Sequence, residues 1–128
     1  MFILDMRTGA VEKHVVAHGQ GSDRGHSGYV RNFGNSNYRT PAGILLTGET
    51  YNGNHGYSLR LDGQEAQNSA SRRRLIVMHP APYVSKSWLR RYGKPGRSLG
   101  CLAVDPADSR QIINKIRGGS VVLNYAGD

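Results

Sequence analysis

The sequence predicts a mainly β domain, built as a sandwich or partial barrel with one or two short helices. Its 128 residues are the usual length of one domain, so we expect residues 1–128 to share one core. Short apolar runs recur along the chain, and many of the 17 glycines stand between them as in turns. Only one segment, near the C-terminus, shows a clear helical repeat of apolar residues.

The N-terminal part predicts a hairpin followed by a long loop. Residues 2–6 and 11–17 are short runs rich in β-branched and aromatic side chains, and a glycine-bearing turn at residues 7–10 joins them. Residues 18–38 are rich in Gly, Ser, Asn and Arg without a sustained period. A loop of that length in a compact domain is usually functional, so we expect it to act as a lid over a cleft.

Four further segments carry strand or helix signals. Residues 44–48 and 57–61 predict strands, and the second alternates apolar with polar side chains as a half-buried strand does. Residues 74–79 are nearly all apolar after the first, which is typical of a strand covered on both faces. Residues 120–125 predict a last strand.

Two segments predict helices. Residues 84–92 predict a short basic helix ended by the glycines and proline that follow. Asp105 is a candidate N-cap, Pro106 fits a first helical position, and an isoleucine face leads from there to Gly118.

Charge and cysteine content limit the function classes. Seventeen Lys and Arg against nine Asp and Glu give a net charge of +8, which attracts polyanions, although the arginines could simply solvate one face. Aromatic residues do not alternate with the arginines as in a single-strand nucleic-acid groove, and no apolar run is long enough to span a membrane. We therefore expect no nucleic-acid partner and no membrane span.

The cysteine and histidine content argues against metal sites and disulfides. A lone cysteine, Cys101, excludes an intramolecular disulfide and a cysteine zinc site. No histidine pair has the spacing of a helical metal site, so we expect neither metal nor cofactor.

The segment GRSLGC at residues 96–101 has the features of a reactive thiol. A thiolate is favoured by a nearby cation such as Arg97, and Gly100 can turn backbone N–H groups toward a developing oxyanion. An isolated cysteine is more often a packing residue, and its neighbours must decide between the two roles.

A thiol nucleophile needs a base, and the chain has five histidines. His79 closes a predicted buried strand, where the backbone can hold an imidazole rigidly, so it is the preferred base. His14 is expected to be structural and His26 lies in the long loop, whereas His18 and His55 each precede a glycine and are expected to line a pocket.

Several motifs in order resemble a known family. They are TPAG at residues 40–43, IVMH at residues 76–79 and GRSLGC at residues 96–101, with YNGNHGYSLR at residues 51–60 and YVS at residues 83–85 as further marks. This set resembles the YkuD-type L,D-transpeptidase catalytic domain, in its murein L,D-transpeptidase branch. The resemblance covers residues 2–125.

The resemblance implies a cysteine acyl-transfer enzyme on peptidoglycan stem peptides or muropeptides. It would cleave the L-to-D amide between diaminopimelate or lysine and D-Ala of a tetrapeptide. By the same resemblance Cys101 is the nucleophile, His79 the base, and the Gly100 and Cys101 amides the oxyanion hole. The residues expected to contact substrate are Arg97, Ser98, His55, Tyr51, His18 and Tyr83.

The chain departs from the family pattern at several positions. Leu99 stands where many relatives have a histidine, and Ala103 where many have Asn or Arg. Pro80 follows His79 in place of glycine, and no carboxylate neighbours that histidine in sequence. We therefore expect a backbone carbonyl to hold its second ring nitrogen, giving a two-residue core rather than a triad.

Three alternatives remain open at this level. An amine acceptor would give a crosslink, whereas water would make the protein an L,D-carboxypeptidase that trims recycled muropeptides. If Met1 is the native start, the enzyme is expected in the cytoplasm, and in the cell envelope if a signal was removed. The third alternative is a non-catalytic wall-binding module with Cys101 packed inside, and the oligomeric state stays open.

Overall fold

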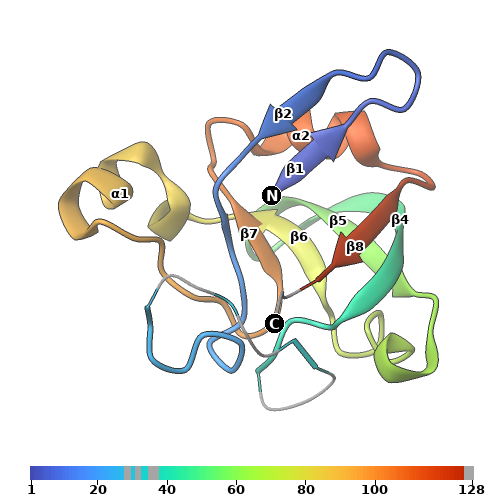
Figure 1. Ribbon diagram of the computed structural model, residues 1–128, viewed down its shortest axis with the longest axis horizontal. Coiled ribbons are helices and arrows are strands. Elements are labelled where there is room, and N and C mark those ends of the chain that lie inside the picture. The colour runs from blue at the N-terminus through green and yellow to red at the C-terminus, as the bar shows by residue number, and fades with distance from the viewer. Residues whose placement is uncertain (28–29, 31–32, 35–37, 126–128) are drawn as a thin grey trace.

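A curled six-stranded sheet dominates the computed structural model, which describes residues 1–27, 30, 33–34 and 38–125 (Figure 1). Its strand order is β3-β7-β6-β5-β4-β8, and a hairpin of β1 (Phe2–Leu4) and β2 (Val11–Lys13) stands apart as a second sheet. The sheet strands are β3 (Val16–Ala17), β4 (Gly43–Gly53), β5 (Gly56–Gly63), β6 (Val77–Pro80), β7 (Leu102–Val104) and β8 (Val121–Asn124). The mainly β class with a partial barrel is thus confirmed.

One strand pair in this sheet is parallel, and it involves the two strands nearest the candidate site. β6 runs parallel to β7, with Met78 opposite Leu102 and His79 opposite Ala103. The other pairs in the sheet are antiparallel. A parallel pair needs a long crossover, and residues 81–101 supply it with η2 (Pro82–Val84) and α1 (Lys86–Tyr92).

The sheet packs differently on its two faces because side chains alternate along each strand. Met78 and Leu102 belong to the larger core, which α2 (Ser109–Ile116) completes with Ile112 and Ile113. Ala103 lies on the opposite face, in a smaller cluster with Ala17, Ala81 and Val84. His79 pairs with Ala103 and therefore shares this second face.

Both predicted helices form, and each begins later than expected, α1 at Lys86 rather than Val84 and α2 at Ser109 rather than Pro106. α1 starts after Ser85, whose hydroxyl accepts from Trp88 N, and ends at Gly93 in the left-handed conformation. The Asp105 N-cap prediction is wrong: α2 is capped at Asp108. The Asp105 side chain instead accepts from Ala107 N, because this residue caps the turn that precedes the helix.

Two strand predictions need correction, and one strand was not predicted. Residues 11–17 do not form one strand, because β2 pairs with β1 while β3 leaves the hairpin to pair with β7. The strand predicted at residues 74–79 starts only at Val77, because turns occupy residues 70–75. β7 was not predicted, since three residues are too few to show a period.

Two smaller features complete the description of the fold. A 3-10 turn, η1 (Ala66–Asn68), follows β5. Within the described ranges, every helix is too short or too polar to cross a membrane.

Thr47 ties β4 to the segment between α2 and β8, and its substitution tests this link. Its buried hydroxyl donates to Ile116 O at 2.6 Å and accepts from the Gly119 and Ser120 amides at 3.0 and 2.8 Å. Thr47→Val keeps the volume but leaves these buried groups unpaired, so we expect the free energy of unfolding to fall by about 2 to 4 kcal/mol. Urea denaturation measures it.

The matched control is Thr50→Val in the same strand, whose side chain forms no hydrogen bond with a described residue. We expect it to change stability by about 0.5 kcal/mol or less. Equal losses in the two variants would contradict the role of Thr47.

Candidate active site

His79 is held rigidly at the end of a central strand. Its side chain is buried, with 2% of the residue exposed, and its Nδ1 atom lies 2.9 Å from Pro80 O. Because a carbonyl oxygen only accepts, Nδ1 must carry the proton in this bond, which leaves Nε2 free to accept one. The expected backbone carbonyl partner is therefore confirmed.

His55 covers the His79 ring. It lies in the turn between β4 and β5, and the two imidazoles stack with centroids 4.2 Å apart and planes 16° from parallel. Burial lowers the pKa of His79, and the charge of His55 lowers it further, while the bond to Pro80 raises it. The net direction is downward, so His79 stays neutral to lower pH than a solvated histidine does.

Cys101 lies immediately before β7, in the bend that leads into the strand. His79 pairs with Ala103, so Cys101 precedes the partner of His79 by two residues. The Sγ atom donates to Leu75 O at 3.4 Å and accepts from Val77 N at 3.5 Å.

Leu75, whose carbonyl oxygen accepts the hydrogen bond from the thiol, has an unusual backbone. Its φ is +59°, in the left-handed region that a leucine rarely adopts, and its side chain is 65% exposed. This conformation ends the turn at residues 70–75 and directs the Leu75 carbonyl to the sulfur. Sequence reasoning missed Leu75, because its residue type gives no sign of positive φ.

The surroundings of Cys101 favour the neutral thiol. Burial raises its pKa, and the Val77 amide and the Arg74 charge lower it only in part. Arg74 is held beside the sulfur by a 2.9 Å hydrogen bond from its guanidinium to Arg39 O. The cation acting on the thiol is therefore Arg74, which sequence reasoning did not single out, rather than Arg97.

The loop before Cys101 is fixed by its own serine. Ser98 Oγ donates to Cys101 O at 2.6 Å and accepts from Gly100 N at 3.1 Å. Gly100 has a φ of +134°, and a Cβ there would lie 2.9 Å from Ile76 Cδ1. The Cys101 N–H hydrogen-bonds to no described residue, so this donor is available to a ligand.

A second glycine packs against this loop from the N-terminal side. A Cβ on Gly19 would lie 2.1 Å from Tyr38 O and 2.8 Å from Gly100 Cα. Gly19 forms a bridge with Ser98, and its N–H donates to Thr40 Oγ1 at 2.9 Å. The TPAG motif therefore supports the cysteine loop through its threonine.

The remaining predicted contact residues fall into two groups. Tyr83 lies near the thiol, since burial and then the Cys101 charge raise its pKa to about 12. Tyr51 shares the His79 face on β4 and stacks beneath Arg60 at 4.0 Å. Arg97 instead donates to Asp23 O at 2.9 Å.

His18 is the predicted residue that lies apart from the others. It follows Ala17, whose side chain packs against the His79 face, so the alternation turns His18 to the opposite face beside Met78 and Leu102. Its ring contacts Phe33 edge to face at 5.0 Å. Burial, with the charge of the N-terminus, lowers the pKa of His18 to about 4.

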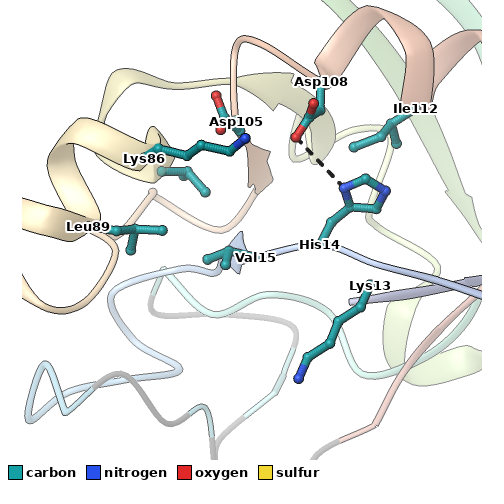
Figure 2. A pocket seen from close by; sticks show the side chains of 9 residues that line it. Lys13, His14, Val15, Lys86, Leu89, Asp105, Asp108 and Ile112 are labelled. Atoms are coloured by element: carbon teal, nitrogen blue, oxygen red, sulfur yellow. Dashed lines mark ion pairs between the residues drawn. The ribbon is translucent and has the colours of Figure 1, made fainter.

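Two hollows in the surface lie away from Cys101 and His79. One, of about 160 Å³, is lined by Lys86 and Asp105 at one end and by His14 at the other, with the His14 ring 3.9 Å from Asp108 (Figure 2). The other, of about 1130 Å³, lies beside β1 and β8. The lid prediction for residues 18–38 includes residues 28–29, 31–32 and 35–37, which lie outside the described residues.

The fold and this geometry define a curled β-sheet domain with a buried histidine and a glycine-cysteine turn on adjacent parallel strands. Residues 1–125 match the family model described as the L,D-transpeptidase catalytic domain, and the chain belongs to that family. The family implies an enzyme with a peptidoglycan substrate. No curated protein and no solved structure gives a significant match.

The donor set offers little to a metal ion. In the part of the chain that the structure describes, no three His, Cys, Asp or Glu side chains are grouped to hold one.

Arg74→Gln tests which cation acts on the thiol. The Arg74 charge lowers the pKa of Cys101 and so offsets part of the increase that burial causes. Without this charge the pKa should rise, and the pH midpoint for alkylation should move upward. The measurement is the iodoacetamide reaction rate against pH. Arg73→Gln, an exposed neighbour, should leave the midpoint unchanged, and an unshifted midpoint in Arg74→Gln would contradict the assignment.

Proposed function

We propose that the protein is a single-domain L,D-transpeptidase acting through a Cys101 acyl-enzyme on stem tetrapeptides. The observation that supports this proposal is the parallel pairing of β6 and β7, which aligns His79 with Ala103, two residues after Cys101. The family membership supports the reaction class. The substrate bond is the amide between the third residue, diaminopimelate or lysine, and D-Ala.

The first step forms a thioester. Nε2 of His79 takes the thiol proton as the sulfur attacks the carbonyl carbon, and the carbonyl oxygen becomes an oxyanion. The C–N bond then breaks, and the imidazolium returns the proton to the departing D-Ala amine. An amine of a second stem peptide attacks the thioester and restores the thiol, which completes a crosslink.

The protonation states of the two groups support a base-assisted attack rather than a preformed thiolate. The pKa of Cys101 is raised and that of His79 is lowered, so both groups are neutral at rest. A neutral imidazole with its proton on Nδ1 is the form that accepts from a thiol at Nε2. In this mechanism the S–H bond turns from Leu75 O toward the ring when substrate enters.

Backbone amides supply the stabilisation of the oxyanion. The Cys101 N–H is the free donor, and the Gly100 N–H joins it once its bond to Ser98 Oγ opens. The net charge of +8 favours the acidic wall polymer as the wider substrate. Tyr51, Tyr83 and His55 would then contact the peptide from the His79 face.

Cys101→Ala is the direct test of this proposal. We expect release of D-Ala from a disaccharide tetrapeptide to fall on the order of a thousandfold or more, because no other group can form the thioester. Mass spectrometry of the products measures it, and a dimer or a tripeptide identifies the acceptor as amine or water.

The control is Ser87→Ala, a change in the exposed first turn of α1, which should release D-Ala at the wild-type rate. Full turnover by Cys101→Ala would refute the acyl-enzyme. An inert wild-type protein that binds cell-wall sacculi would leave only the wall-binding module.

His55→Gln tests the protonation of His79. The substitution removes a charge and a covering ring that both lower the pKa of His79, so this pKa should rise. Since the base must be neutral, the acid limb of kcat/KM should move to higher pH. Asn54→Gln in the same turn is the control, and identical pH profiles for wild type and His55→Gln would rule out the coupling.

A further inference from the structure

The hollow of about 1130 Å³ lies beside two strand edges that pair with no further strand of the described residues. In Figure 1 β1 (blue) and β8 (red) run along the same side of the molecule, and residues of both line this hollow. β8 is the last strand of the six-stranded sheet, and β1 belongs to the separate hairpin. Unpaired strand edges of this kind accept further strands.

The hydrogen-bonding pattern of β8 shows which of its backbone N–H and C=O groups are free. Thr47 N donates to Ser120 O at 2.9 Å, and the register pairs Leu45 with Val122 two residues further on. Alternate residues of a strand point their backbone groups to opposite sides. The N–H and C=O groups of Val121 and Leu123 therefore point away from β4 and meet no described backbone partner.

Backbone groups alternate between the two sides of β1 in the same way. His14 N donates to Met1 O at 2.9 Å and Asp5 N to Ala10 O at 2.8 Å, so the odd-numbered residues of this strand face β2. Phe2 and Leu4 then direct their N–H and C=O groups away from β2. Both edges of the gap thus present alternating donors and acceptors.

The side chains beside these free groups are apolar and exposed. The exposed fractions of Phe2, Leu4, Val121, Leu123 and Tyr125 lie between 61% and 74%, and all five line the hollow. β8 contains neither the charged residues nor the proline that usually protect an edge strand from pairing. Exposed apolar residues gathered on an open edge indicate a surface that is normally covered.

The chain path relates the two free edges to the rest of the sheet. β2 is followed after two residues by β3, the opposite edge strand of the sheet. Going round the molecule, the order is therefore β3, β7, β6, β5, β4, β8, the hollow, β1 and β2. A strand between β8 and β1 would join the two sheets and turn the half-barrel into a nearly closed one.

The charged groups that line the hollow indicate which kind of peptide strand could bind there. The charged groups of the lining are Asp5 and Glu12 against Arg7, Lys115 and the Met1 ammonium, and Lys115 is paired with Glu12 at 2.6 Å. Burial keeps His18, the remaining ionisable side chain, neutral by lowering its pKa to about 4. This near balance contrasts with the net +8 of the whole chain, so the groove does not attract a polyanion strongly. It fits a neutral peptide whose backbone supplies the hydrogen bonds.

We propose that this groove binds an extended segment of a partner polypeptide as an added β-strand, uncharged and with apolar side chains at alternate positions. Main-chain bonds to Val121, Leu123, Phe2 and Leu4 give the affinity, and the apolar side chains of the partner cover Met78 and Leu102 at the base of the groove. The inference is independent of the proposed enzymatic function, since the groove lies on the face opposite His79.

The probe is a fluorescein-labelled heptapeptide in which Val alternates with Thr, titrated by anisotropy against the whole chain. We expect saturable binding, and amide exchange by NMR should slow at Leu4, Val121 and Leu123 but change little at Ile3 and Val122. The same peptide N-methylated at every second residue should not bind. Cys101→Ala should bind as the wild type does, which separates this site from catalysis.

Leu123→Lys places a charge on the free edge and should weaken binding by about tenfold or more. Val11→Lys changes an exposed residue of β2 outside the groove and is the matched control, expected to bind normally. Absence of saturable binding, equal binding by the N-methylated peptide, or a dimer whose edge amides are already protected would each overturn the proposal. The last outcome would assign the edge to a second copy.

Discussion

The parallel pairing of β6 with β7 is the interaction on which the candidate site depends. It is the parallel pair in a sheet otherwise built of antiparallel pairs, and it aligns His79 with Ala103, two residues after Cys101. The crossover between the strands carries α1 and then returns through the loop at residues 93–100. A shift of one residue in this register would turn either side chain to the opposite face of the sheet.

Close packing of two glycines fixes the position of the sulfur once the register is set. Gly19 and Gly100 approach so closely that a Cβ on the first would collide with the second, and Thr40 holds the Gly19 amide. The positive φ of Leu75 adds a second fixed element, because it directs a carbonyl at Sγ. Backbone groups from three separate segments therefore set the orientation of the thiol, and the short side chains of Thr40 and Ser98 hold two of these segments in place.

Local patterns predicted what depends on local chemistry. The strand ending at His79, the Gly100-Cys101 turn and the helix α1 were each predicted, because apolar runs and glycine turns mark them in the chain. The split of residues 11–17, the three-residue strand β7 and the positive φ of Leu75 depend on tertiary pairing and leave no local pattern. His18 does line a hollow, but on the face opposite His79, because the pairing of β3 with β7 determines which face it takes.

Burial acts on both members of the proposed catalytic pair in a consistent way. It raises the pKa of Cys101 and lowers that of His79, so that a thiolate–imidazolium pair is disfavoured while the site is empty. The thiolate is the form that oxidants and alkylating agents attack, and a neutral thiol is therefore protected. In the proposed reaction the thiol would lose its proton to His79 only as the sulfur attacks a carbonyl carbon. The negative charge would then pass to the carbonyl oxygen, where the Cys101 amide would stabilise it. The desolvation that protects the thiol from oxidation and alkylation would thus also strengthen the electrostatic stabilisation of the oxyanion in acyl transfer.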